Sequence, residues 1–195
     1  MIIGITGGTG CGKTTLLNLI AEQGGLVLDC DSIYHSLLQS DNAMLQAIED
    51  RFPGTVTNGH LNRKKLGGIV FQDKKALLDL NNITHSAVKK EVLRHLETAP
   101  KLCAIDAIGL FESGLDALCD VTVAVIAPEE DRVRRLIARD GISEEYARSR
   151  IAAQHPNGWF TGKCGYTLEN NGQLDAFATK CIAFLRQLGI MEEKP

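Results

Sequence analysis

Short runs of apolar, β-branched residues alternate along this chain with longer segments in which apolar residues recur at helical spacing. The short runs predict strands at 2–6, 26–29, 102–106, 121–126 and, with a weaker pattern, 166–168. The segments between them predict helices, the first over 13–23. The last helix has one apolar face, formed by Phe177, Cys181, Phe184, Leu185 and Leu188. Because this alternation is typical of parallel strands joined by crossover helices, the predicted fold class is α/β, with a parallel five-stranded sheet flanked by helices.

One connection is much longer than a crossover helix requires, since about 70 residues separate the second predicted strand from the third. Its apolar residues recur every four positions, at Val88, Val92 and Leu96, which predicts a helix. An earlier helix is expected to run to Phe52, with Asp41 or Asn42 as its N-terminal cap. We interpret this segment as a helical insert that binds the substrate.

The overall composition excludes several classes of protein. The 195 residues are 44% hydrophobic and 23% charged, which suits one compact domain rather than a disordered chain. The formal net charge of -3 provides no overall positive field, so we expect neither nucleic-acid nor membrane partners. The longest apolar run, 121–127, is too short to cross a bilayer, and the N-terminus lacks a signal-peptide pattern. We therefore expect a cytoplasmic protein.

Six cysteines are spread along the chain without any Cys-x-x-Cys pair. This spacing argues against a zinc site and against a thioredoxin-type redox site. We expect reduced, mostly buried thiols. The five histidines show no metal-ligand spacing either.

A glycine-rich segment directly follows the first predicted strand and precedes the first predicted helix. It reads Gly-Gly-Thr-Gly-Cys-Gly-Lys-Thr-Thr over 7–15 and fits Gly-x-x-x-x-Gly-Lys-Ser/Thr, the pattern of a phosphate-binding loop. Its backbone N–H groups and the positive end of the helix dipole attract phosphate oxygens. We expect Lys13 to reach the β- and γ-phosphates of a nucleotide, and the Thr14 hydroxyl to bind Mg²⁺. The candidate nucleotide-binding residues are Gly8, Thr9, Gly10, Cys11, Gly12, Lys13, Thr14 and Thr15.

Cys11 lies within this loop, next to a helix N-terminus, and two interpretations of it stay open. In one, the position lowers the pKa of its thiol, so that oxidation would block nucleotide binding. In the other, a small residue simply fills a small space.

Two carboxylates, Asp29 and Asp31, follow the second predicted strand and would share one face if the extended conformation persists. Ligands of open parallel sheets bind at such strand ends. One carboxylate could accept the proton of an attacking hydroxyl, and the other could bind Mg²⁺ through water. Alternatively, Asp31 or Ser32 caps a helix that begins near Ile33.

Arginines are concentrated after the fourth predicted strand. Arg132, Arg135 and Arg139 are spaced so that they share one helix face, and Arg148 and Arg150 follow on the next helix. We interpret the five as a local cationic cluster in an otherwise acidic protein. Forked guanidinium groups match the charge that spreads over a transferring phosphoryl group. The alternative is a solvated surface.

These motifs together resemble the dephospho-coenzyme A kinase family. The similar segments run in the family's order across nearly the whole chain: Thr6–Thr14, Asp29–Ile33, Leu61–Arg63, Val70–Phe71, Ile83–His85, Leu110–Leu115, Arg135–Gly141, Arg150–Ile151, Gln154, Asn170 and Gly172. The chain departs from the family near the predicted lid, where Phe160 replaces an expected lysine at the lid's tip and Cys164-Gly165 replaces an Ala-Asp pair.

The resemblance implies a three-layer P-loop kinase fold and a reaction. The core would span about 1–31, 102–128 and 166–195, the acceptor-binding insert about 32–101 and a small lid about 129–165. The γ-phosphate of ATP would pass to the ribose 3′-hydroxyl of dephospho-coenzyme A, the last step of coenzyme A synthesis, with Mg²⁺ present. We expect a monomer, with an oligomer left open.

The resemblance also implies roles for single residues. Asp31 would be the general base, with Asp29 supporting it, and Lys13 and Arg139 would stabilise charge. The implied acceptor-binding residues are Asp31, Arg63, His85, Phe111 and Glu112, and the lid arginines are Arg135, Arg139 and Arg150. Without the resemblance, His85 could be a helix-start histidine and Arg63 a solvated charge.

Three other functions are weighed against this one. A GTPase-like switch is suggested by Asp106-Ala107-Ile108-Gly109, which fits Asp-x-x-Gly, but no Asn-Lys-x-Asp motif accompanies it. A kinase for another small alcohol, of shikimate or nucleoside type, would share the phosphate loop. A descendant that binds nucleotide in another role is the third.

Overall fold

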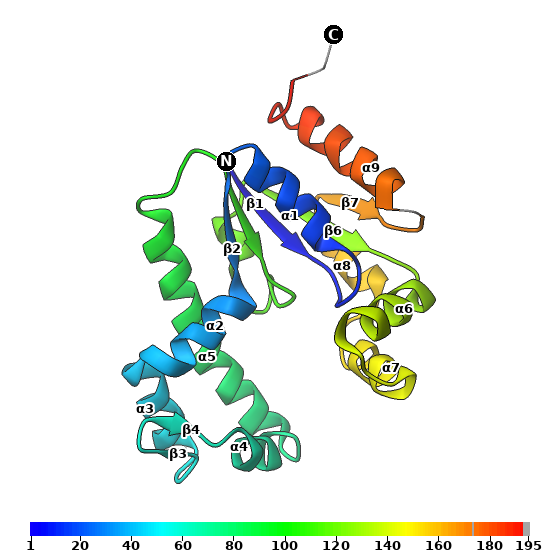
Figure 1. The fold of residues 1–195 in the computed structure, drawn as a ribbon. Coiled ribbons are helices and arrows are strands. Elements are labelled where there is room, and N and C mark those ends of the chain that lie inside the picture. Colours follow the sequence, from blue (N-terminus) through cyan, green and yellow to red (C-terminus); the bar gives the residue numbers. More distant parts are fainter. Residues whose placement is uncertain (173, 193–195) are drawn as a thin grey trace. The chain divides into compact units, whose positions relative to one another are not determined.

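The computed structural model describes residues 1–172 and 174–192, which form two compact units. The first unit consists of residues 1–28 and 99–195, and the second of residues 29–98. The strands and helices of the first unit are β1 (Ile2–Thr6), α1 (Lys13–Glu22), β2 (Leu26–Asp29), β5 (Cys103–Asp106), β6 (Val121–Ile126), α6 (Glu129–Asp140), α7 (Glu144–Ala152), α8 (Asn157–Lys163), β7 (Tyr166–Glu169) and α9 (Leu174–Gln187), with a short 3-10 helix at Asp116–Leu118 (Figure 1).

The first unit is built on a five-stranded sheet in the order β2-β5-β1-β6-β7. β1 pairs in parallel with β5 and β6, and β6 pairs in parallel with β7. The five predicted strands are confirmed, with small shifts at the start of β5 and the end of β7. Because parallel strands end at the same edge, the loop after β1, Asp106 of β5 and the residues after β7 come together there.

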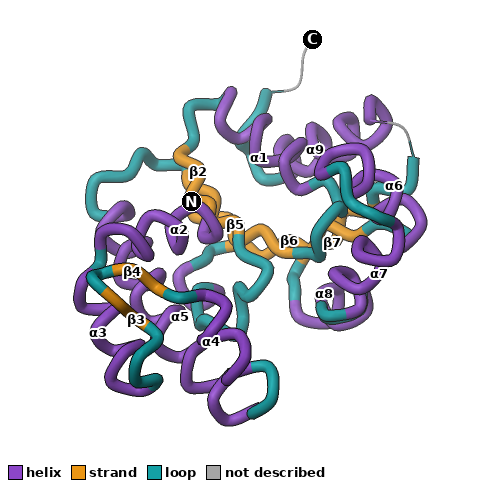
Figure 2. The backbone as a smooth tube through the Cα atoms, turned by 60° about the horizontal axis from the view of Figure 1, so that its bottom comes forward, coloured by secondary structure: helices purple, strands orange, loops and turns teal. Residues whose placement is uncertain are grey.

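Helices cover both faces of this sheet. Figure 2 shows α1 and α9 on one face and α8 on the other. The core between β1, β6, α1 and α9 is apolar. It includes the predicted apolar face of α9, of which Phe177, Cys181, Phe184 and Leu185 are buried and Leu188 packs against them. Burial of apolar surface contributes about 25 cal/mol for each Å², and this contribution holds the layers together.

A smaller apolar cluster joins α6 to α7. It consists of Val133, Leu136, Ala147 and Ile151, packed with two half-buried isoleucines. One face of α6 therefore packs against α7, and the arginines of α6 project from its other faces.

The second unit is mostly helical. It contains α2 (Cys30–Ser40), α3 (Asn42–Arg51), α4 (Arg63–Val70) and α5 (Lys74–Leu96), with a small hairpin of β3 (Val56–Thr57) and β4 (His60–Leu61) that the hydrophobic pattern did not indicate. Asp41 caps α3, since its carboxylate accepts from the N–H groups of Ala43 and Met44. His85 lies in the interior of α5, so the helix-start interpretation is wrong.

The cysteines are as predicted: all six are reduced, without a disulfide, and Cys11, Cys30, Cys103 and Cys181 are buried. Burial raises the pKa of the Cys181 thiol to about 11. Within residues 1–172 and 174–192, no helix is both long enough and apolar enough to cross a membrane.

Candidate active site

The glycine-rich loop before α1 has a backbone conformation that leaves no room for a Cβ atom at two of its glycines. Gly12 has φ +96°, and a Cβ there would lie 2.3 Å from Nδ2 of Asn170. A Cβ on Gly7, at φ +135°, would lie 2.0 Å from the Val125 carbonyl oxygen of β6. The glycines therefore allow a turn that sits directly on the neighbouring strand and on the segment after β7.

Lys13 is held at the first position of α1 by two oxygens. Its Nζ donates to the Gly7 carbonyl oxygen at 3.1 Å and lies 3.8 Å from Oδ1 of Asp106. Both side chains are largely shielded from solvent, which strengthens their attraction. The ammonium group is thus placed above the loop rather than free in solvent.

Asp106 is a candidate functional residue that the sequence reasoning considered only as part of a switch motif. It ends β5, and the parallel register sets it opposite Ile5, just before the loop begins. Part of the signal was present in the sequence, because an acid at the end of a parallel strand lies at the edge where ligands bind, but only the sheet order shows that β5 is next to β1.

Arg132 supports the loop from its carbonyl side. Its Nε donates to the Thr9 carbonyl oxygen at 2.9 Å, and a terminal nitrogen donates to Oε1 of Gln154 at 2.9 Å. The same Gln154 oxygen accepts from the Thr9 N–H at 2.9 Å. Arg132 is only 4% exposed, so its charge depends on these partners.

Arg135 and Asn170 support the next part of the loop. Arg135 donates to the Gly10 carbonyl oxygen at 3.1 Å and to Oδ1 of Asn170 at 3.1 Å. Asn170 in turn donates to the Cys11 carbonyl oxygen at 2.9 Å. These groups donate hydrogen bonds to the loop carbonyls. The side of the loop that carries the amide N–H groups is therefore the side that a phosphate group would meet.

The other three arginines of the predicted cationic cluster are paired with acids, which offset part of its positive charge. Arg139 and Arg150 both bind Asp140, at 2.6 and 2.8 Å, and they hold the pKa of that carboxyl at about 2, with the Arg139 hydrogen bond as the largest cause. Arg148 binds Glu129, Glu130 and Glu144. Arg139 stays 61% exposed, with its Nε and one terminal nitrogen on Asp140.

Asp29, and not Asp31 or Ser32, caps the helix after β2. Its carboxylate accepts from the N–H groups of Asp31 and Ser32, at 2.9 and 3.1 Å, and from the Ser32 hydroxyl at 2.9 Å. Because α2 already begins at Cys30, the extended conformation ends at Asp29, and the two carboxylates do not share a strand face. Asp31 lies exposed in the first turn of α2.

The other predicted acceptor-binding residues divide between the two units. Arg63 is exposed at the start of α4. Burial raises the pKa of Tyr34, and the positive charge of Arg63 partly offsets this rise. His85 is half-buried within α5. Phe111 and Glu112 lie in the turns that follow β5 in the first unit.

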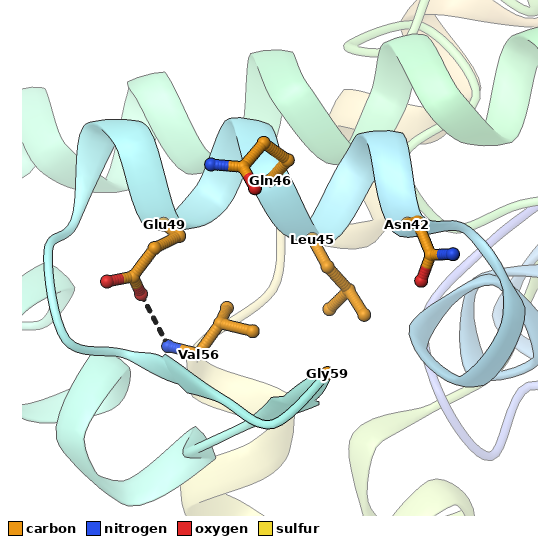
Figure 3. Close-up of a pocket in the computed structure, with 6 residues that line it drawn as sticks. All are labelled: Asn42, Leu45, Gln46, Glu49, Val56 and Gly59. Carbon is orange, nitrogen blue, oxygen red and sulfur yellow. Dashed lines mark hydrogen bonds between the residues drawn. The ribbon is translucent and has the colours of Figure 1, made fainter.

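A shallow groove of about 340 Å³ lies in the second unit, between α3 and the β3–β4 hairpin (Figure 3). Its carboxylate, Glu49, accepts from the N–H groups of Gly54 and Val56, the latter at 2.6 Å. The Val56 hydrogen bond is the main cause that lowers the pKa of Glu49. This acid therefore fixes the hairpin and provides no reactive group.

Two expectations about the loop and lid are corrected. Cys11 is fully buried, and burial raises the pKa of its thiol despite the nearby charges of Arg132 and Lys13. The reactive-thiol interpretation is wrong because the sulfur faces the core. Phe160 is also fully buried, so it is a core residue of α8 and not the tip of a lid.

Comparison with known proteins decides the family of this site. The family model described as dephospho-CoA kinase matches residues 1–176. The chain belongs to the dephospho-CoA kinase family. A dephospho-CoA kinase from Geobacillus kaustophilus is 33% identical, with 99% of each chain covered.

Two solved structures agree with this assignment. The protein TT1252 from Thermus thermophilus has a TM-score of 0.80 at 33% identity, over 96% of this chain and 97% of that one. A dephospho-CoA kinase from Campylobacter jejuni has a TM-score of 0.68 at 25% identity, over 97% and 98%. As a member of this family, the protein is an ATP-dependent phosphotransferase, so the switch interpretation of Asp106–Gly109 is wrong.

Proposed function

We propose that this chain transfers the γ-phosphate of ATP to the ribose 3′-hydroxyl of dephospho-coenzyme A, with the residue roles that follow. The observation that carries the proposal is the braced phosphate loop, with Lys13 held between the Gly7 carbonyl and Asp106. The family membership supports the reaction, and the geometry of this loop supports the residues proposed for the donor half.

The loop binds the donor. Its N–H groups and the N-terminus of α1 attract the phosphates, while Arg132, Arg135 and Asn170 hold the carbonyls behind them. Lys13 needs only a small movement from Gly7 to reach a phosphate oxygen. Charge that develops between the β- and γ-phosphates is then stabilised by a group already in place.

The residues near Lys13 fit a magnesium ion. The Thr14 side chain is exposed in the first turn of α1, and the Asp106 carboxylate lies beside Lys13. A hydroxyl and a carboxylate are hard oxygen ligands, and Mg²⁺ takes few protein ligands when it is shared with phosphates. When bound, it would neutralise charge on the β- and γ-phosphates of ATP.

Asp31 is the proposed general base for the acceptor hydroxyl. The Asp29 cap fixes the first turn of α2, and so it fixes the backbone that carries Asp31. The proposed acceptor contacts are Arg63, His85, Phe111 and Glu112. Arg139 stabilises the moving phosphoryl group after its guanidinium group leaves Asp140. Arg150, which shares Asp140, takes the released carboxylate. We propose that the enzyme acts as a cytoplasmic monomer.

A coupled assay of ADP release tests the proposal. Protein and Mg-ATP are mixed with dephospho-coenzyme A, with coenzyme A, or with other alcohols such as shikimate and nucleosides. We expect ADP release with dephospho-coenzyme A alone, because coenzyme A already carries the 3′-phosphate. Acceptor-dependent release with another alcohol, and none with dephospho-coenzyme A, would reject the proposal.

A further inference from the structure

An aromatic and charged cluster joins the turns after β5 to the region of α8, apart from the phosphate loop. Nε2 of His155 lies 2.9 Å from Oε1 of Glu112. The imidazole ring also stacks on Trp159, with 3.9 Å between centroids and 8° between planes. The carboxylate of Glu112 is therefore held by a ring that cannot rotate freely.

Helix α8, which follows His155, holds the neighbouring Phe111. Trp159 meets the Phe111 ring edge to face at 5.9 Å, and Nζ of Lys163 lies 5.3 Å from the Trp159 centroid and 5.6 Å from that of Phe111. Beneath them, the buried ring of Phe160 contacts Trp159 at 5.1 Å. Two consecutive residues of the turn are thus fixed by side chains of one short segment.

Stability alone does not account for the contact between His155 and Glu112. The His155 and Glu112 side chains are 48% and 36% exposed, and exposed ion pairs contribute little to folding. What the contacts do restrict is the rotamers of Glu112 and Phe111. A side chain ordered before a ligand arrives does not lose that freedom on binding, so its contact with the ligand is stronger.

We propose that His155 is a positioning residue for acceptor specificity, which holds the Glu112 carboxylate ready to accept a hydrogen bond from the nucleoside end of the acceptor. Trp159 and Lys163 hold Phe111 in the same way, as the apolar surface beside that carboxylate. This inference rests on the proposed function, in which Phe111 and Glu112 contact the acceptor.

Steady-state kinetics of His155→Ala, His155→Gln and Glu112→Gln tests the inference. For His155→Ala we expect a rise of about three- to tenfold in KM for dephospho-coenzyme A, with kcat and KM for ATP within about twofold, since one side chain loses its order. His155→Gln keeps a donor near the Nε2 position and should recover most of the loss. In the Glu112→Gln background, His155→Ala should add nothing.

His95→Ala is the matched control. His95 also lies beside a glutamate, with its Nε2 3.2 Å from Glu91, but at the end of α5. It should leave all three constants unchanged. Circular dichroism confirms that each variant is folded, and should His155→Ala not fold, His155→Phe, which keeps a ring to stack on Trp159 but has no donor for Glu112, replaces it.

Three results would overturn the inference. A parallel rise in KM for ATP would mean that His155 acts through the adjacent Gln154 and its bond to Thr9. An unchanged acceptor KM in His155→Ala, with a raised one in Glu112→Gln, would remove the positioning role. An unchanged KM in Glu112→Gln would show that acceptor binding does not depend on the Glu112 carboxylate, although wild-type turnover of dephospho-coenzyme A would still uphold the proposed function.

Discussion

Replacing Gln154 by leucine removes one acceptor from two buried donors at once. Its Oε1 accepts from the Thr9 N–H and from the Arg132 guanidinium, both at 2.9 Å. Thr9 is 8% exposed and Arg132 is 4% exposed, so bulk water cannot readily replace the lost oxygen. Leucine has a similar volume, so that the change is one of polarity more than of packing.

The expected destabilisation follows from the number of donors left without a partner. A buried donor that loses its acceptor costs about 1–3 kcal/mol, and a charged one costs more, so the two together cost about 2–5 kcal/mol. For a chain of this size, 1 kcal/mol lowers Tm by about 2–4 °C. Thermal unfolding should therefore show a Tm about 5–15 °C lower, and ATP should bind more weakly because the loop loses a brace.

Two further variants control this experiment. Gln154→Glu keeps an oxygen acceptor and adds a charge that suits Arg132, so it should lose far less stability. Gln72→Leu changes an exposed glutamine of the second unit and should leave Tm unchanged. If Gln154→Leu melts within about 1 °C of the wild type, the loop does not depend on this clamp and the reasoning fails.

Four other predictions concern the loop and the start of α2. Asp31→Asn should lower kcat by about 10²–10⁴-fold while the Kd for ATP stays within about twofold by calorimetry, because only the base is lost; an equal loss of both would contradict the role. Asp29→Ala removes the cap of α2 and should lower the free energy of unfolding by about 1 kcal/mol in urea titrations, whereas Asp29→Ser should restore most of it. Gly12→Ala should abolish ATP binding, because its Cβ would meet Asn170 at 2.3 Å; retained binding would show that the loop yields. Burial raises the pKa of Cys11, so at pH 7.5 its thiol stays neutral and mass spectrometry should find it unalkylated by iodoacetamide until the protein unfolds.

Local patterns in the sequence were sufficient to predict the strands of the main sheet and to propose the donor half of the site. Strands are short, and their apolar runs stand out against the helical spacing between them, so β1, β2 and β6 were predicted with their observed bounds. The phosphate loop was equally readable, because glycine spacing and the following helix are features of consecutive residues. The order of motifs along the chain was enough to indicate the family.

The parts that failed depended on a single turn of backbone or on burial. Asp29 and Asp31 carry the same group, and the choice of cap was made by where the extended conformation ends. Cys11 follows a helix N-terminus rule that lowers a thiol pKa, but burial outweighs it. The arginines after β6 have a cationic pattern, yet Arg139, Arg148 and Arg150 pair with acids of α6 and α7.

By itself, the sequence determined the strands of the main sheet and the family of the chain, and it predicted the phosphate-binding loop, because these depend on neighbours along the chain. Only the tertiary structure decided that Asp106 faces Lys13, that Gln154 and Asn170 bind the loop from 145 and 159 residues away, and that His155 holds Glu112. These contacts follow from the register and order of the parallel strands, which bring distant residues to one edge of the sheet. No local spacing encodes that register, so it could be seen only once the sheet was assembled.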